Sequence, residues 1–158
     1  MLYPLKMIPE YKSLIWGGEK LKTKYNKPIK SNKTGESWEV SCHKNGYSHV
    51  ENGEYAGKSL PEVCDILKTG LLGGKYQNMD AGGASARFPL LMKIIDACDD
   101  LSIQVHPDDD YALQHEGDLG KTEMWYIVDA ERDSKIVMGV KENVTKEEFR
   151  NAFKHYKV

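Results

Sequence analysis

Cysteine is scarce in this chain of 158 residues, which contains three: Cys42, Cys64 and Cys98. Because they are odd in number, widely spaced and without a CxxC pair, the sequence argues against a disulfide framework or a thiolate zinc site and favours a reducing, cytoplasmic setting. Long apolar runs are also absent. The longest, over 88–95, is interrupted by Lys93 and is far too short to span a membrane. The N-terminus has no basic head followed by an apolar stretch, so we expect no secretory signal.

The chain also lacks a strong excess of charge of one sign, since its formal net charge is −2. The charges are unevenly placed: residues 1–35 carry eight lysines and two acids, whereas residues 96–133 carry twelve acids and two basic residues. A nucleic-acid-binding protein concentrates basic and aromatic side chains on its working surface. The part of this chain that is richest in reactive side chains is acidic, so we expect no nucleic-acid partner.

The length suits one globular domain over 1–158. We expect an N-terminal region over 1–85 with a helix over 59–70, a set of strands over 86–140 and a helix over 145–157. Ser59 with Glu62, and Thr145 with Glu148, have the spacing of a capping box, which marks helix starts. A third, short helix is expected to begin in 108–110.

Strand-like runs separate these helices, and turn-forming residues separate the runs. The fold class predicted from this order is mainly β with appended helices (α+β). The expected strands cover 38–42, 87–95, 101–106, 122–129 and 135–140.

The segment 101–106 alternates strictly between polar and apolar residues. In a strand, side chains two positions apart share a face. One face therefore carries Ser102, Gln104 and His106, and the other carries Leu101, Ile103 and Val105. Pro107 cannot continue a ladder of hydrogen bonds, which places His106 at the end of the strand.

A second polar pair lies on the next expected strand, where Lys121 and Glu123 share a face that continues with Trp125 and Ile127. If the two polar faces meet, an amide, an imidazole and a carboxylate converge, and such nitrogen and oxygen donors suit Zn²⁺. The alternative from the pattern alone is a strand with one face toward solvent.

Three stretches closely resemble type I mannose-6-phosphate isomerase (phosphomannose isomerase). They are Phe-Pro-Leu-Leu-Met-Lys-Ile-Ile-Asp at 88–96, Leu-Ser-Ile-Gln-Val-His-Pro-Asp-Asp at 101–109 and Gly-Lys-Thr-Glu-Met-Trp-Tyr at 120–126. Residues 14–18 and 35–41 are similar to the family's N-terminal part, and the likeness extends over about 11–140.

The resemblance implies part of a cupin-type jelly-roll β-barrel enzyme that interconverts mannose 6-phosphate and fructose 6-phosphate with one Zn²⁺. Carried over by position, the metal ligands would be Gln104, His106 and Glu123. The side chains at the hexose 6-phosphate would be Ser102, Lys93 and Lys121, with Lys121 as the catalytic residue. The proton-transfer base is not identified.

The resemblance also implies a further histidine ligand and a catalytic arginine, and no motif in this sequence matches either. None of His43, His49, His115 and His155 sits in such a motif. The chain therefore resembles the N-terminal half of such an enzyme, and we expect weak or absent turnover from it alone. We further expect self-association, or association with a missing C-terminal half, through exposed apolar strand faces.

Other interpretations remain open at this point. One alternative is a non-catalytic cupin-like module that binds a sugar phosphate or assembles with a partner. Another is a cupin iron oxygenase, which fits less well because Gln104 occupies a position where a second histidine would be expected. Lys93 in an apolar strand would alternatively extend its ammonium to water. The aspartates at 108–110 lack the calcium-loop pattern and fit a helix N-cap better.

Overall fold

The computed structural model of the protein describes residues 2–74 and 88–155. The chain divides into two compact units, Met1–Leu101 (unit 1) and Ser102–Val158 (unit 2). Each is described by itself below. The organisation of residues 1–158 as a single domain stays a prediction.

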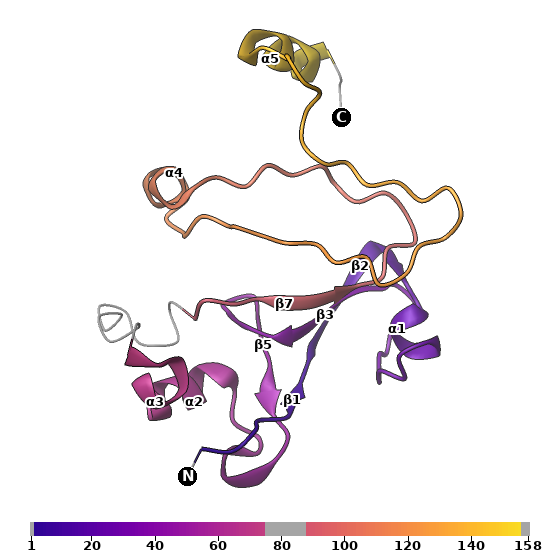
Figure 1. Ribbon diagram of the computed structural model, residues 1–158. Coiled ribbons are helices and arrows are strands. Elements are labelled where there is room, and N and C mark those ends of the chain that lie inside the picture. Colours follow the sequence, from indigo (N-terminus) through magenta and orange to yellow (C-terminus); the bar gives the residue numbers. More distant parts are fainter. Residues whose placement is uncertain (1, 75–87, 156–158) are drawn as a thin grey trace. The chain divides into compact units, whose positions relative to one another are not determined.

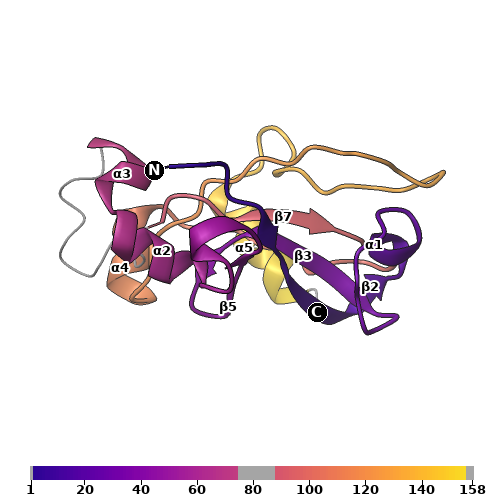
Figure 2. The same ribbon diagram turned by 90° about the horizontal axis from the view of Figure 1, so that it is seen from below.

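Unit 1 is built on a three-stranded antiparallel sheet with the order β2-β3-β7. Its strands are β2 (Glu10–Gly18), β3 (Thr34–Val40) and β7 (Met92–Ile95). The central strand β3 runs between the other two (Figures 1 and 2). In this register Trp38 stands opposite Glu10 on one side and Lys93 on the other. The expected strand over 87–95 is thus shorter and less buried than predicted, and Arg87 lies outside the described residues.

Two short antiparallel ribbons accompany this sheet in the described part of unit 1. β1 pairs with β6, and β4 pairs with β5. The short elements are β1 (Met7–Ile8), β4 (Cys42–His43), β5 (Gly46–Tyr47), β6 (His49–Val50), α1 (Lys20–Thr23) and the 3₁₀ turn η1 (Gly53–Tyr55).

The helix expected over 59–70 is two helices, α2 (Leu60–Leu67) and α3 (Thr69–Leu72). The predicted capping box is present: the Ser59 amide and hydroxyl both donate to Glu62 Oε2, at 2.8 and 2.6 Å. The C-terminal end of the predicted helix was wrong. Lys68 adopts a left-handed conformation with φ 46° and breaks the helix before Gly70. Such a conformation is uncommon for a residue other than glycine, so the sequence gives no signal for this break.

Apolar side chains are buried at both ends of unit 1. Leu60, Val63 and Cys64 of α2 and Val50 of β6 are buried. Leu21 of α1, which lies at the other end of the sheet in Figure 1, is buried as well. Close backbone packing at the far end of β2 excludes a side chain, since a Cβ at Gly17 would overlap the backbone of Gly35.

Unit 2 contains two helices, α4 (Asp109–His115) and α5 (Lys146–His155), joined by long extended segments. Both helix starts were predicted correctly. Asp108 Oδ1 accepts a hydrogen bond from the Tyr111 amide at 2.9 Å, and Thr145 forms its capping box with Glu148. The last residues of the helix expected over 145–157 lie outside the described residues.

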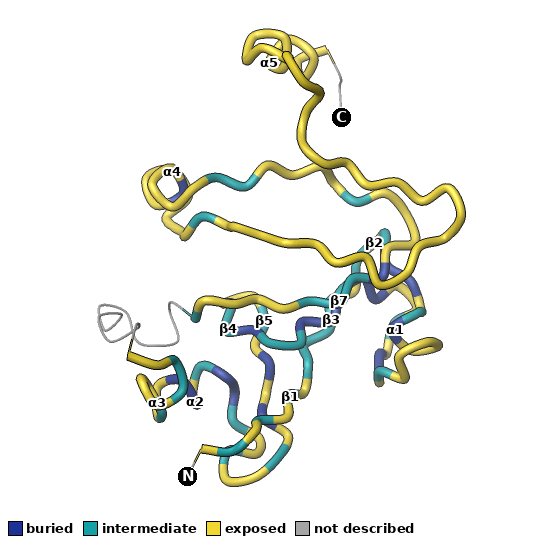
Figure 3. Tube along the Cα trace, viewed as in Figure 1, coloured by how far each residue is buried: buried dark blue, intermediate teal, exposed yellow. Residues whose placement is uncertain are grey.

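The strands expected over 101–106, 122–129 and 135–140 are not formed as paired strands in the described part of unit 2. Alternation predicts an extended backbone with two distinct faces, but a strand also needs a neighbour that supplies hydrogen bonds. These segments have no such ladder among the described residues, and almost all of unit 2 is exposed (Figure 3). Within the described residues, no helix is both long and apolar enough to span a membrane.

Candidate functional site

The segment 102–107 leads directly into the N-cap of α4 and becomes more shielded toward that end. Ile103 and Val105 are 77% and 82% exposed, and Ser102 and Gln104 on the other face are exposed as well. The side chain of His106 is 23% exposed. Of the predicted ligands on this segment, His106 is therefore the shielded one.

The segment that follows α4 returns to residues 107–109, where two hydrogen bonds hold it. The Lys121 amide donates to the Pro107 carbonyl at 3.2 Å, and the Gly120 amide donates to Asp109 Oδ1 at 2.9 Å. A Cβ at Gly120 would lie 2.5 Å from the backbone carbon of Asp108. Only glycine allows this approach, which brings residues 121–123 beside His106.

Glu123 is the centre of the resulting cluster. Its carboxylate lies 3.0 Å from Lys121 Nζ and 3.5 Å from His106 Nε2, and it accepts a hydrogen bond from Trp125 Nε1 at 3.1 Å. Lys121, Glu123 and Trp125 are two positions apart along the chain, as the shared face requires. The structure thus joins three predicted site residues and adds Trp125 as a donor to the carboxylate.

The surroundings of Glu123 favour its ionised form. Partial burial acts to raise the pKa of this carboxyl, but hydrogen bonds from Lys121 and Trp125 and the charges of Lys121 and His106 act in the opposite direction. The net result is a pKa below the ordinary glutamate value. An ionised carboxylate is the form that ligates a cation.

The spacing of His106 and Glu123 fits a shared metal ion. Two ligands that bind one zinc ion at about 2.1 Å, with tetrahedral angles, lie about 3.4 Å apart. Nε2 of His106 and Oε1 of Glu123 are 3.5 Å apart. In the described residues no three His, Cys, Asp or Glu side chains gather as a metal cluster, so a third protein ligand would have to be of another type, such as the glutamine amide.

Gln104 lies two residues before His106, on the same face of the segment. Its amide Nε2 donates to Ser102 Oγ at 3.1 Å. The side-chain carbonyl oxygen of Gln104 is therefore the atom that would bind a metal ion. Ser102 and Gln104 therefore contact one another, and the contacts of these two side chains do not extend to Glu123.

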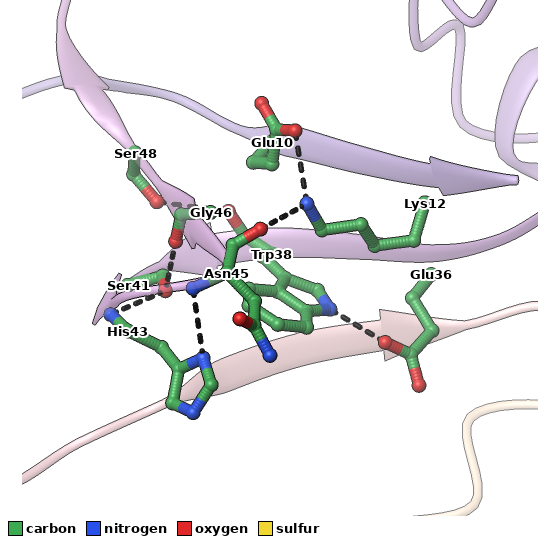
Figure 4. Close-up of polar contacts among 9 residues, drawn as sticks. All are labelled: Glu10, Lys12, Glu36, Trp38, Ser41, His43, Asn45, Gly46 and Ser48. Atoms are coloured by element: carbon green, nitrogen blue, oxygen red, sulfur yellow. Dashed lines mark hydrogen bonds and ion pairs between the residues drawn. The ribbon is translucent and has the colours of Figure 1, made fainter.

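Lys93, the remaining predicted residue, belongs to β7 of unit 1. Its ammonium lies 3.1 Å from Glu36 Oε2 and 4.6 Å from the centre of the Trp38 ring. Glu36 also accepts a hydrogen bond from Trp38 Nε1 at 2.5 Å (Figure 4). The side chain of Lys93 is 20% exposed, so it is held by a carboxylate and a ring rather than simply extended into water.

A second cation contacts the same ring. Lys12 Nζ lies 4.9 Å from the centre of the Trp38 ring, and it donates to the carbonyl of Asn45 and to Glu10 (Figure 4). Sequence reasoning missed this cluster because Lys12, Trp38 and Lys93 come from three different strands, β2, β3 and β7. The sequence signal that could have pointed to this cluster was Glu36, because it lies in the stretch 35–41 that resembles the family.

Comparison with known proteins identifies the family. Residues 4–150 match the family described as phosphomannose isomerase type I, catalytic domain. This chain belongs to the type I phosphomannose isomerase family. The resemblance predicted from the sequence motifs is therefore confirmed.

Individual relatives agree with this placement. The chain is 47% identical over 155 residues to a probable mannose-6-phosphate isomerase of Bacillus subtilis (strain 168), covering 95% of this chain and 45% of the relative. It is 43% identical over 150 residues to a mannose-6-phosphate isomerase of Streptococcus mutans, covering 95% of this chain and 44% of the relative. The chain thus spans about half the length of these type I isomerases.

A solved structure supports the fold. The crystal structure of the mannose 6-phosphate isomerase from Bacillus subtilis superposes with a TM-score of 0.71 at 44% identity, covering 81% of this chain and 38% of that chain. The expected class, mainly β with appended helices as part of a larger isomerase fold, is confirmed. The individual metal and substrate roles remain predictions.

Proposed function

We propose that this chain contributes to an aldose–ketose isomerase acting on mannose 6-phosphate and fructose 6-phosphate. The observation that carries this proposal is the pairing of His106 with Glu123 at 3.5 Å, beside Lys121, in a member of the type I phosphomannose isomerase family. The substrate class comes from the names of the relatives, which are mannose-6-phosphate isomerases.

We propose Gln104, His106 and Glu123 as ligands of one Zn²⁺. The donor set is one imidazole nitrogen, one carboxylate and one amide oxygen, which suits zinc and leaves an open position. When bound, zinc supplies Lewis-acid stabilisation of the negative oxygen that develops when a proton leaves the carbon next to a carbonyl.

The lysines and the serine would handle the charged substrate. Lys121 lies beside the proposed metal ligands, where its ammonium would stabilise negative charge on the sugar, which is its proposed catalytic role. Ser102 and Lys93 are proposed to bind the substrate through its hydroxyl or phosphate groups. The Lys93 ammonium contacts Glu36 and Trp38, so a phosphate would compete with the Glu36 carboxylate for it.

Zinc binding is the first test of this proposal. We expect the purified chain to bind one equivalent of zinc by calorimetry, and we expect His106→Ala and Glu123→Gln to lose this binding. His155→Ala is the matched control, because His155 lies on α5 and contacts the carbonyl of Asn151. Zinc binding that survives in His106→Ala, or none in the unaltered chain, would reject the proposed ligands.

Isomerase activity is the second test, and it separates an enzyme from a non-catalytic sugar-phosphate-binding or assembly module. We expect weak or absent turnover from the 158 residues alone. Fusion to the segment of the Bacillus subtilis isomerase that this chain does not match should produce turnover, and His106→Ala should abolish it. A folded fusion that binds zinc without turnover would favour the non-catalytic module.

We also propose that unit 2 associates through its exposed apolar side chains, with a second copy or with a C-terminal half. These side chains include Ile103, Val105, Met124, Tyr126 and Val128, all at least 66% exposed.

Light scattering and binding of an apolar dye test this association. Val105→Lys should reduce both dye binding and self-association. Ile15→Lys is the control, since Ile15 is 87% exposed in unit 1. A monomer that binds no dye would refute the proposal.

We propose a cytoplasmic location as well, supported by the three cysteines, which are odd in number, widely spaced and without a CxxC pair, a pattern that fits a reducing compartment. Cell fractionation tests it, and recovery of the protein from an oxidising compartment would contradict it.

A further inference from the structure

Two cysteines that are far apart in the sequence meet in unit 1. Cys42 begins β4 and Cys64 lies in the second half of α2, and their sulfur atoms are 3.8 Å apart. Cys64 is completely buried, whereas Cys42 is partly exposed. The third cysteine, Cys98, is exposed, and its backbone amide donates to Trp16. Cys42 is therefore the less buried residue of the pair.

Backbone hydrogen bonds fix the approach of the two sulfurs. Ser48 connects the two segments, because its amide donates to the Ser41 carbonyl at 3.0 Å and its carbonyl accepts from the Leu60 amide at 2.8 Å. Ser41 directly precedes Cys42, and Leu60 begins the helix that carries Cys64. Ser48 is itself fully buried. The sulfur contact is thus part of the packed structure of unit 1 and does not depend on a loose loop.

The two sulfurs are close enough to share one hydrogen bond, in which either sulfur can be the donor. When the Cys42 thiol donates, this hydrogen bond lowers the pKa of Cys64. When the Cys64 thiol donates, the same contact stabilises a thiolate on Cys42. A thiolate held in contact with a second sulfur is placed to displace a leaving group from it.

We infer that Cys42 and Cys64 form a reversible dithiol–disulfide pair that is oxidised by a small disulfide such as glutathione disulfide. With the Cys64 thiol as the hydrogen-bond donor, the Cys42 thiolate attacks one sulfur of that disulfide, forms a mixed disulfide and releases the first glutathione thiolate. The Cys64 thiolate then attacks the Cys42 sulfur, forms the Cys42–Cys64 bond and releases the second. The two protein thiol protons pass to the two released thiolates, so the pair is oxidised while one glutathione disulfide is reduced to two thiols.

The bond would tie β4 covalently to α2 and close the loop between them. This loop contains the β4–β5 ribbon, β6, η1 and the start of α2. Closing a loop of this kind restricts the unfolded chain and stabilises the folded one. The oxidised chain should therefore unfold at a higher temperature than the reduced chain. This site is separate from the proposed metal ligands, all of which lie in unit 2.

The test uses the whole chain equilibrated with graded mixtures of reduced and oxidised glutathione, then trapped with an alkylating reagent. In Cys98→Ser, we expect oxidation to remove both remaining thiols and to lower the intact mass by two hydrogen atoms. Peptide mapping should place the bond between residues 42 and 64. In Cys42→Ser, with the fold checked by circular dichroism, Cys64 should stay a free thiol.

Mapping of the unaltered chain keeps the test independent of any variant that fails to fold. The inference is overturned if both thiols stay free at every glutathione ratio, or if oxidation yields only glutathione adducts or bonds between molecules. It is supported if the 42–64 bond forms, breaks again with reduced glutathione and raises the unfolding temperature while present.

Discussion

Replacing Gly120 by alanine should separate the two proposed zinc ligands that lie closest together. The new Cβ would lie 2.5 Å from the backbone carbon of Asp108 and 2.6 Å from the amide nitrogen of Asp109. Ordinary contacts begin at 3.4 Å, so the backbone must open by about 0.9 Å. Backbone atoms near a helix N-terminus cannot turn aside as a flexible side chain can.

The consequence for metal binding follows from the geometry. His106 Nε2 and Glu123 Oε1 are 3.5 Å apart, and an added displacement of this size would bring them to about 4.4 Å. Two zinc bonds of about 2.1 Å reach across at most about 4.2 Å. We therefore expect Gly120→Ala to weaken zinc binding by about 10-fold to 100-fold, the range seen when the support of a metal ligand is lost.

Competition with a chromogenic zinc chelator measures this change. Gly70→Ala is the matched control, because a Cβ at Gly70 meets nothing within 4 Å, and it should bind zinc like the unaltered chain. If Gly120→Ala also binds zinc with unchanged affinity, the reasoning from the Gly120 contact to the ligand pair is refuted.

The remaining predictions concern the stability of unit 1. Ser41→Ala should lower the free energy of unfolding by about 1–3 kcal/mol, because the buried Ser41 hydroxyl donates to the Gly46 carbonyl at 2.6 Å. Urea unfolding should show a lower midpoint with an unchanged slope, and an unchanged midpoint would contradict this prediction. Hydrogen bonds from Ser59 lower the pKa of Glu62, so its contribution to stability is present above the unfolded glutamate pKa and is lost as the pH falls through the folded value. Glu62→Gln should therefore reduce stability most at neutral pH and progressively less toward low pH. A stability difference that does not vary with pH would argue against this role.

Local features of the structure were predictable from the sequence. The start of α4 follows from Asp108, whose carboxylate caps an amide three residues ahead, and the start of α5 follows from Thr145 and Glu148. Such signals act within one helical turn, so a short stretch of sequence contains all of their parts. Ser102 and Gln104, which the alternation over 101–106 predicts on one face, contact each other.

Features that depend on distant partners were not predictable. Alternation could not show which segments have a neighbouring strand, and residues 122–129 have none among those described. The contact between Lys93 and Glu36 joins residues 57 positions apart, and that between Cys42 and Cys64 joins residues 22 positions apart. No motif spacing predicts such long-range contacts, because they form only when separate elements pack together. The left-handed backbone conformation of Lys68 was also not predictable, since lysine rarely adopts that conformation.

The zinc site is the central claim, and anomalous diffraction at the zinc absorption edge tests it most directly. Crystals of the chain grown with one equivalent of zinc should show a single strong peak. The account predicts this peak about 2.0–2.3 Å from the amide oxygen of Gln104, Nε2 of His106 and the carboxylate of Glu123. A peak at other side chains, such as the sulfurs of Cys42 and Cys64, or no peak in zinc-saturated crystals, would contradict it.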